Sequence, residues 1–367
     1  MDVTCTQENF SKGLQIVSRV ATTKSSLPVL ANILIQTKDG QLRLAATDLE
    51  MGVVTVIGAK VVTDGAITLP ARLLVDFISN NTDPTLQIGV NQGEATISSD
   101  RHKATVKGMD AAEFPLIPTV TDAKMLSLPA KALRSGLRDV LFAAAIDDAR
   151  PVLNGICIHL REKMLILAAT DSYRLAERRI PLKAVAAEGS LLLPVRAAQE
   201  IVRILPDTDQ VVTVQFTANQ ILVEVDNTQI VSRLIDGTFP DYTQIIPTNP
   251  TTTMSVDRGE LISAVRMASL FARDASHNIR FSLAAPTSCS ITAVSTTVGQ
   301  NTATVAATVT GESVDIAFNA KYLLDALNIL SSETIRLDVS GTDRAGVFHA
   351  EGDEHYLSLV MPLRTDG

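Results

Sequence analysis

The carboxylates of Asp48 and Asp171 are the groups in this sequence that most invite a catalytic interpretation, because each closes a copy of the pentapeptide LAATD. A carboxylate in a fixed position can serve as a general base. The same residue type also ends a strand, by accepting hydrogen bonds from the backbone N–H groups of the following turn. Since the pentapeptide occurs twice, we expect a structural turn at both positions. A hydrolase that uses Asp171 with Tyr173 is the enzyme alternative.

The sequence lacks the common motifs for phosphate, dinucleotide and zinc binding. It contains no G-x-x-x-x-G-K-[ST], no G-x-G-x-x-G after a strand-like run and no H-E-x-x-H. Its five histidines have no ligand spacing, and Cys5, Cys157 and Cys289 stand alone in apolar runs. We therefore expect no catalytic residue, metal, cofactor or disulfide, and a reduced, cytoplasmic setting. We also expect no signal peptide and no membrane span, because no apolar run approaches about 20 residues.

Basic side chains recur at helical spacing, although the chain as a whole is acidic with a formal charge of −8. Lys131, Arg134 and Arg138 lie three, four and seven residues apart, and Arg196 and Arg203 lie seven apart. Six helix-like segments and their ends carry twelve Lys or Arg against seven acids, a net of +5 that leaves −13 elsewhere. A surface that is basic only where helices line up would bind a phosphate backbone without reading sequence. Solvated helix faces are the alternative.

The elements that must position these residues are repeated along the chain. LAATD stands at Leu44–Asp48 and again at Leu167–Asp171, 123 residues later, which is the length of a whole domain. The third unit has SITAVST at Ser290–Thr296 in its place. Each unit begins with a helix-like segment, at Gln7–Val20, Pro129–Ala144 and Asp257–Ala272. Each later carries a strand that enters a helix, at Ile67–Ser79, Leu191–Leu205 and Ile316–Leu330.

Short alternating runs fill the rest of each unit, and turn signals such as Lys38-Asp39-Gly40-Gln41 join them into hairpins. The sequence therefore predicts an α+β protein of three tandem homologous domains, each with two helices packed on antiparallel sheet. We place these domains at 1–120, 125–248 and 252–367. Tryptophan is absent and aromatic residues make up 4%, so the cores must be built from aliphatic side chains.

Five segments together resemble a known family. They are LNG at Leu153–Gly155, ATDSYRLA at Ala169–Ala176, DGTFPDY at Asp236–Tyr242, FNAKYLLDAL at Phe318–Leu327 and VMPLR at Val360–Arg364. Jointly they closely resemble the bacterial DNA polymerase III beta subunit, the sliding clamp, over essentially the whole chain. The resemblance implies a head-to-tail homodimeric ring of six domains that encircles duplex DNA. It also implies a non-catalytic processivity factor that tethers the replicative polymerase, and a separate ATP-driven loader that opens the ring.

The resemblance also implies three sets of functional residues. A groove between the second and third domains would bind a short linear motif of polymerases, the clamp loader and repair factors. It would consist of Leu153, Thr170, Tyr173, Arg174, Leu175, Pro240, Ile245, Asn319, Tyr322, Val360, Met361, Pro362, Leu363 and Arg364. Leu175, Ile245, Val360 and Met361 would form an apolar floor, with Arg174 and Arg364 available for polar or carboxylate groups.

DNA contacts would come from the basic helices and from loop residues. The set is Lys24, Arg72, Lys131, Arg134, Arg138, Arg150, Arg196 and Arg203. The dimer interface would pair a strand of the first domain with the third domain of a second copy. Its residues would be Arg101, Lys103, Ala104, Val106, Leu270 and Phe271.

Several positions depart from the family pattern. In one well-known form the region of Gly299–Ala303 is rich in acids and faces Arg101 and Lys103, whereas here it reads GQNTA. Gln244 stands where that form has arginine, and Pro151 and Val152 replace aromatic positions. The missing acids leave open a second kind of protein, a monomeric peptide-binding scaffold of clamp fold that closes no ring. A molar mass near twice 39.2 kDa would count against it.

Overall fold

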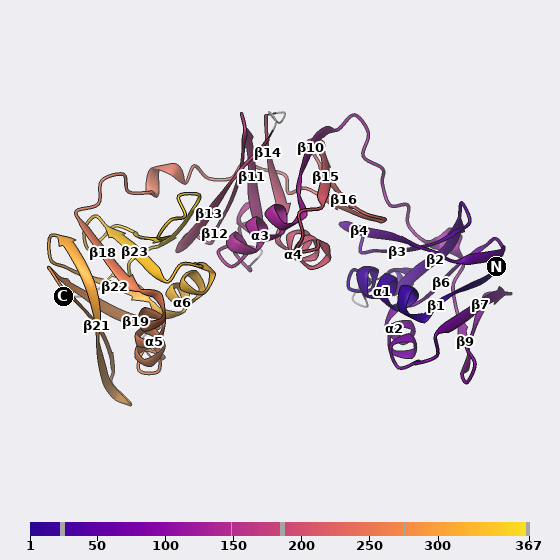
Figure 1. Ribbon diagram of the computed structural model, residues 1–367, viewed down its shortest axis with the longest axis horizontal. Coiled ribbons are helices and arrows are strands. Elements are labelled where there is room, and N and C mark those ends of the chain that lie inside the picture. The colour runs from indigo at the N-terminus through magenta and orange to yellow at the C-terminus, as the bar shows by residue number, and fades with distance from the viewer. Residues whose placement is uncertain (23–25, 148, 184–187, 275, 365–367) are drawn as a thin grey trace. The chain divides into compact units, whose positions relative to one another are not determined.

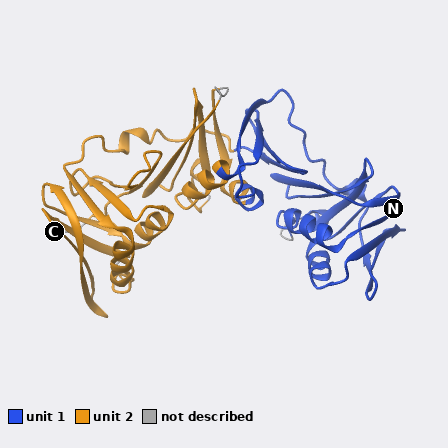
Figure 2. Ribbon diagram, in the orientation of Figure 1, with its two compact units in different colours: residues 1–131, 200–234 blue, residues 132–199, 235–367 orange. Residues whose placement is uncertain are grey.

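The computed structural model describes residues 1–22, 26–147, 149–183, 188–274 and 276–364 (Figure 1). Contacts divide the chain into two compact units (Figure 2). Unit 1 comprises Met1–Lys131 and Glu200–Leu234, and unit 2 comprises Ala132–Gln199 and Ile235–Gly367. Among the helices described, none combines the length and apolar character needed to cross a membrane.

Each of the three repeats supplies two α-helices. The first helices are α1 (Gln7–Val17), α3 (Ala130–Leu141) and α5 (Arg258–Ser269), and the second are α2 (Ala71–Ser79), α4 (Val195–Ile204) and α6 (Ala320–Ile329). The sequence predicted these six helices, but it extended each first helix by about three residues. In those residues the backbone turns continue with i to i+3 hydrogen bonds, such as Val20 N–H to the Val17 carbonyl at 3.2 Å and Ala143 N–H to the Val140 carbonyl at 3.0 Å. The last helical turn therefore tightens rather than stopping abruptly.

Unit 1 contains a five-stranded antiparallel sheet and an eight-stranded antiparallel sheet. The five-stranded sheet has the order β5 (Lys60–Thr63), β1 (Asp2–Thr6), β7 (Thr85–Asn91), β8 (Glu94–Ser98), β9 (Lys103–Lys107). The eight-stranded sheet has the order β10 (Lys124–Pro129), β15 (Val211–Phe216), β16 (Gln220–Val225), β17 (Thr228–Arg233), β4 (Met51–Ile57), β3 (Gln41–Thr47), β2 (Asn32–Lys38), β6 (Ala66–Pro70). Its central pair, β17 with β4, connects the second repeat to the first. We call this pair the first joint.

Unit 2 contains twelve strands in one connected antiparallel arrangement. Their order is β14 (Gly189–Pro194), β11 (Gly155–Arg161), β12 (Met164–Thr170), β13 (Arg174–Pro181), β25 (Tyr356–Val360), β24 (Gly346–Ala350), β23 (Thr334–Val339), β18 (Thr252–Asp257), β21 (Gly299–Gly311), β20 (Ser288–Ser295), β19 (Asn278–Ala284), β22 (Val314–Asn319). The pair β13 with β25 connects the second repeat to the third. We call this pair the second joint.

The cores are mostly aliphatic, as predicted, but the largest fully buried side chains are Phe10, Phe281, Phe318 and Phe348. Helix α1 lies beside α2 as α5 lies beside α6 (Figure 1). Gly13 of α1 and Gly136 of α3, again 123 residues apart, bring the first helices close to the sheet. A Cβ on Gly13 would lie 2.6 Å from Leu44 Cδ1, and one on Gly136 would lie 2.6 Å from Ile180 Cδ1. The repeat therefore keeps a glycine at a helix position where a larger residue would have to displace the end of a sheet side chain.

The predicted hairpins are confirmed where the sequence carries turn residues. Asp39 and Gly40 have φ of 52° and 73°, and they join β2 to β3 in a two-residue turn. Gln92 and Gly93, with φ of 49° and 81°, join β7 to β8 in the same way. Such turns match the right-handed twist of the strands they connect. The four 3-10 helices described are Pro28–Ala31, Ala111–Glu113, Pro151–Leu153 and Thr243–Ile245.

Candidate functional site

The two LAATD segments end in the same hydrogen-bonded turn. Asp171 Oδ1 accepts the backbone N–H groups of Tyr173 and Arg174 at 2.9 and 3.0 Å. Asp48 Oδ1 accepts those of Glu50 and Met51 at 3.1 and 2.8 Å. The structural interpretation of both aspartates is thereby confirmed, because their carboxylates cap the turn.

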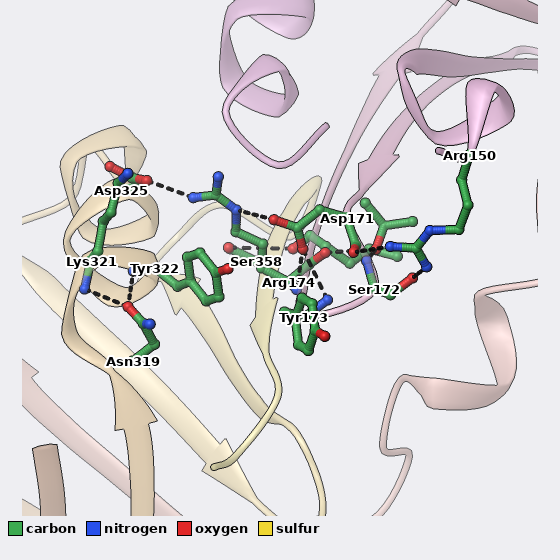
Figure 3. A network of polar contacts seen from close by, with 12 residues as sticks. Arg150, Asp171, Ser172, Tyr173, Arg174, Asn319, Lys321, Tyr322, Asp325 and Ser358 are labelled. Atoms are coloured by element: carbon green, nitrogen blue, oxygen red, sulfur yellow. Dashed lines mark hydrogen bonds and ion pairs between the residues drawn. The ribbon is translucent and has the colours of Figure 1, made fainter. Parts of the chain in front are cut away.

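The turn of unit 2 carries an exposed tyrosine that stacks on a half-buried tyrosine of α6 (Figure 3). Tyr173 is 59% exposed, and its ring stacks on that of Tyr322 with centroids 6.4 Å apart and planes 23° apart. Tyr322 lies in the first turn of α6, where Asn319 Oδ1 accepts the N–H groups of Lys321 and Tyr322 at 2.9 and 3.3 Å. The cap of α6 and the Asp171 turn thus bring Tyr173 and Tyr322, which are 149 positions apart in the sequence, into one aromatic surface.

Arg174 lies beneath this aromatic pair and is 6% exposed. Its guanidinium contacts Asp171 Oδ2 at 3.0 Å and Asp325 Oδ2 at 2.5 Å, and it lies 4.6 Å from the Tyr322 ring centroid (Figure 3). Burial, and then the negative charge of Asp171, raise the pKa of Tyr322 above its ordinary value. The sequence predicted that Arg174 would be available for a ligand carboxylate. Its guanidinium is instead used within the protein, to hold Tyr322 and the turn together.

The residues after β25 fasten the Tyr173 turn to the third repeat. Met361 N–H donates to the Tyr173 carbonyl at 2.8 Å, and Leu363 N–H donates to the Ala317 carbonyl at 2.8 Å. Met361, Pro362 and Leu363 are partly buried, and Arg364 is exposed. The C-terminal segment of the described chain therefore lies alongside the turn, with Arg364 free to face solvent.

The remaining predicted groove residues divide into core and surface. Leu153, Leu175 and Val360 are 2%, 0% and 0% exposed, so they support the site from below rather than line its surface. Thr170 is also buried, where its hydroxyl donates to the Arg174 carbonyl at 2.6 Å. Ile245 is 44% exposed, and Pro240 is exposed as well.

The segment that carries Pro240 and Ile245 is anchored by the last residue of the DGTFPDY motif, which was not among the predicted groove residues. Tyr242 is buried, and its hydroxyl donates to Glu177 Oε2 of β13 at 2.6 Å. Arg179 binds Glu177 Oε1 at 2.7 Å. The Phe239 ring lies edge-on to Tyr242, with centroids 6.1 Å apart. These contacts fix the segment on the same strand that bears Arg174.

Arg150 lies next to the Tyr173 turn, although the sequence assigned it to DNA. Its guanidinium donates to Ser172 Oγ at 2.6 Å and to the Asp171 carbonyl at 3.1 Å (Figure 3). Ser172 has a φ of 78°, a conformation uncommon for residues with a side chain. Arg150 therefore holds the outer edge of this turn.

The other predicted DNA residues lie on or beside the helices of both units. In unit 2, Arg138 and Arg196 are exposed and Arg134 is half-buried, and Arg138 lies 3.4 Å from Asp139. In unit 1, Arg72 and Lys131 are exposed. Lys24 falls outside the described residues.

Arg203 is already engaged within unit 1. Its guanidinium donates to the carbonyls of Gln15 and Ile16, near the end of α1, at 3.0 and 2.6 Å. It also binds Glu200 Oε2 at 2.6 Å. A cation beside the last carbonyls of a helix stabilises the negative end of the helix dipole. Arg203 thereby fastens α4 to α1.

The predicted dimer residues lie on β9 and just before it in unit 1, and at the end of α5 in unit 2. On β9, Lys103 is exposed and Val106 is 7% exposed, with the partly buried Ala104 between them. At the end of α5, Leu270 is 49% exposed and Phe271 is partly buried. Arg101 forms an ion pair with Asp83 of its own domain at 2.6 Å.

Comparisons with known proteins agree with this architecture. Family models of the DNA polymerase III beta subunit match residues 1–118 as its N-terminal domain, 127–241 as its central domain and 243–364 as its C-terminal domain. A beta sliding clamp of Staphylococcus aureus is 30% identical over 375 residues, with 100% of both chains covered. One from Synechocystis is 32% identical over 388 residues, with 99% of each chain covered.

Solved structures show the same fold. The DNA polymerase sliding clamp of Bacillus subtilis has a TM-score of 0.96 at 27% identity, covering 100% of this chain and 99% of that one. A sliding clamp of Pseudomonas aeruginosa bound to griselimycin has a TM-score of 0.96 at 27% identity, with 100% of both chains covered. The chain belongs to the DNA polymerase III beta subunit family. Its fold is three tandem clamp domains, and the family is non-catalytic, which excludes the hydrolase alternative.

Proposed function

We propose that two copies of this chain close head-to-tail into a ring of six domains that encircles duplex DNA in the bacterial cytoplasm. The observation that carries this proposal is the full-length match to sliding clamps in three consecutive clamp domains. The domains are bounded near 1–120, 125–248 and 252–367. A ring holds DNA by topology, so tight binding is not needed.

The DNA contacts in this proposal are weak and independent of sequence. Arg72 and Lys131 of unit 1, and Arg134, Arg138 and Arg196 of unit 2, supply positive charge from helices in a chain of net charge −8. Contacts with phosphates are nearly equivalent at every position along a duplex, so the ring can slide without changing its binding energy. The acidic remainder of the chain disfavours DNA binding elsewhere on its surface.

The partner surface in this proposal is the exposed part of the site in unit 2. We define it as Tyr173, Tyr322, Pro240, Ile245, Met361 and Arg364. Its rings and aliphatic side chains suit a short apolar motif, and Met361 can adapt to different ligands because it is unbranched. The buried residues Leu153, Thr170, Arg174, Leu175 and Val360 hold this surface in place. Polymerase, clamp loader and repair factors would then compete for one surface on each chain.

Retention on DNA of different topology tests the proposed function. The dimer, placed on nicked circular DNA by its loader, should remain bound through a gel-filtration column and dissociate after the circle is cut with a restriction enzyme. The control for the loading step is the clamp loaded on circular DNA whose nicks are blocked. Release that does not depend on DNA ends would overturn the proposal. A monomer by light scattering at all concentrations would favour the peptide-binding scaffold.

A further inference from the structure

The partner surface proposed for unit 2 has two parts that come from different stretches of the chain. The aromatic part is the stacked pair Tyr173 and Tyr322. The second part is formed by Pro240 and Ile245, which are exposed on the segment that leads from the second repeat to the third. We call residues 236–247 the connector. Strand β13 holds both parts of the surface, one from each of its faces.

The two faces of β13 carry different side chains, because successive residues of a strand point to opposite sides of the sheet. Arg174 points toward α6, where it binds Asp325 Oδ2 at 2.5 Å (Figure 3). Leu175 and Glu177 point to the opposite face. There Leu175 lies in the same core cluster as Tyr242 of the connector, and Glu177 Oε2 accepts the Tyr242 hydroxyl at 2.6 Å. One strand therefore sets the position of both parts.

The connector has little regular structure to hold it in place. Residues 234–251, all of which the structure describes, contain no strand and one 3-10 helix, Thr243–Ile245. Its backbone hydrogen bonds are local, as between the Ile245 N–H and the Tyr242 carbonyl at 3.2 Å. Phe239 and Tyr242 are 8% and 7% exposed and insert into the core. Within the described chain, the hydrogen bond from the connector to a strand is the one that the Tyr242 hydroxyl donates.

The hydrogen bond between Tyr242 and Glu177 is suited to fixing a position. Glu177 is 3% exposed, and Arg179 Nε donates to its other carboxylate oxygen at 2.7 Å. Burial, and then the negative charge of Glu177, raise the pKa of Tyr242, so its hydroxyl stays protonated and remains a donor. A hydrogen bond to a charged acceptor is short and directional. It therefore fixes where the connector lies on β13, whereas apolar packing is non-directional.

The first joint uses apolar contact at the same place. Val54 occupies the position of Glu177, 123 residues earlier. Ile117 follows the phenylalanine of an F-P pair by three residues, as Tyr242 does. Ile117 packs against the core cluster that contains Val54. The directional hydrogen bond is thus a feature of the joint that carries the proposed partner surface, and not of the clamp repeat as such.

We propose that Tyr242 and Glu177 are positioning residues for partner binding, because their hydrogen bond sets how far the connector part of the surface lies from the aromatic part. This inference rests on the proposed partner surface. Tyr242 is buried, so it acts on a bound segment through the exposed Pro240 and Ile245. Affinity for partner segments then depends on a hydroxyl that no partner touches.

The affinity of a single variant tests this inference. Tyr242→Phe removes the hydroxyl and keeps the ring. Its dissociation constant for a fluorescent peptide that carries the clamp-binding segment of the replicative polymerase should rise about fivefold, as expected for one lost hydrogen bond. Ile117→Val, in the corresponding segment of the first joint, is the matched control and should leave the constant unchanged. An unchanged constant in Tyr242→Phe would overturn the inference, whereas a wild-type chain that does not bind the peptide would overturn the proposed surface.

A second variant separates positioning from a loss of stability. Tyr242→Phe combined with Glu177→Leu replaces both partners by apolar groups, so no buried carboxylate is left unpaired and the melting temperature should return toward that of wild type. The peptide affinity should nevertheless stay about fivefold below wild type, since no directional bond fixes the connector. If affinity recovers together with the melting temperature, the role of the pair is structural only and the inference is overturned.

A double-mutant cycle identifies the side chain through which Tyr242 acts. Ile245→Ala removes the exposed aliphatic group that the hydrogen bond positions. In this background Tyr242→Phe should weaken peptide binding by less than about twofold, because two residues that act through one contact are not additive. A further loss of about fivefold in the Ile245→Ala background would mean that Tyr242 acts elsewhere and would overturn the assignment to the connector.

Discussion

The two joints share one backbone plan but hold their neighbouring domains by different chemistry. At the first joint the hydroxyls of Thr55 and Thr228 form a buried hydrogen bond of 2.9 Å. At the equivalent position of the second joint, 123 residues later, Arg178 binds Asp139 at 2.9 Å and Asp353 at 2.6 Å and lies over the Tyr356 ring. The duplication thus preserved strand pairing while the side chains between the strands diverged.

The same contrast holds at the turns beside the joints. Met51 and Glu50 of the first turn correspond to Arg174 and Tyr173 of the second. In both turns the threonine hydroxyl and the aspartate carboxylate make the same hydrogen bonds to the backbone, so the difference lies in the side chains at these two positions. The buried arginine and exposed tyrosine occur only at the second turn of this pair. The proposal that partner binding belongs to the second joint therefore rests on its side chains and not on its fold.

The largest expected difference between the joints concerns stability. Arg178→Ala leaves the buried Asp139 without its principal cation, which should destabilise the second joint by about 3 kcal/mol. The equivalent Thr55→Ala should cost the first joint about 1 kcal/mol, the value of one hydrogen bond. A chain of several domains does not unfold in one step, so native-state hydrogen exchange of β25 and β17 is the appropriate measurement. Equal losses in the two variants would contradict the ionic character of the second joint.

The next effect concerns binding. Tyr173→Ala should lower the affinity for a fluorescent peptide that carries the clamp-binding segment of the replicative polymerase by about tenfold. An exposed ring is lost in this variant while the core is unchanged. Its matched control is Glu50→Ala, at the same position of the first turn, which should leave affinity unaltered. Fluorescence anisotropy measures both. Leu175→Ala is a poor test, since truncating a fully buried leucine costs about 2 to 5 kcal/mol and would disturb the joint itself.

A smaller effect is expected at the helices of the first joint. Arg203→Ala removes two hydrogen bonds to the last carbonyls of α1 and should cost about 1 to 2 kcal/mol, confined to unit 1. Faster exchange of the α1 amides would reveal it. The exposed Arg72 of α2 is the control, because Arg72→Ala should change DNA binding but not exchange. If hydrogen exchange of the α1 amides is unchanged in Arg203→Ala, Arg203 does not stabilise α1. The DNA contact that the sequence predicted for this residue would then be the better interpretation.

The smallest effect is a pH dependence in the first domain. The folded pKa of Asp83, about 2, lies below the ordinary value of about 3.9. The stability it contributes is therefore complete above about pH 4 and is lost as the pH falls through 2. The melting temperatures of wild type and Asp83→Asn, followed by circular dichroism, should converge over that interval. A constant difference between pH 5 and pH 2 would contradict the ionised Asp83–Arg101 pair.

Features encoded within a few residues could be predicted from the sequence. The turn after LAATD, the hairpin at Asp39-Gly40 and the starts of the helices depend on local residue types, and the structure confirms them. Because the sequence is duplicated, each local prediction in one repeat also applied to the same position of the next, and together they defined whole domains. A further signal was available, since Gly13 and Gly136 occupy the same repeat position where the helix approaches the sheet.

Contacts between distant residues could not be predicted in the same way. Arg174 and Asp325 are 151 positions apart, and Arg178 and Asp353 are 175 apart, so no spacing rule links them. The sequence could not distinguish the fully buried Leu175 from the partly exposed Met361, because both are apolar residues in matching motifs. Likewise Arg203 has the spacing of a DNA-facing residue, and only the structure shows its bonds to α1.

Hydrogen exchange with and without the polymerase peptide is the most direct test of the assignment of partner binding to the second joint. The duplicated turns make the experiment internally controlled, because Thr170–Arg174 and Thr47–Met51 have the same backbone hydrogen bonds. The peptide should slow exchange at Thr170–Arg174 and Met361–Leu363 and leave Thr47–Met51 unaffected. Protection at Thr47–Met51, or at neither turn, would contradict the assignment.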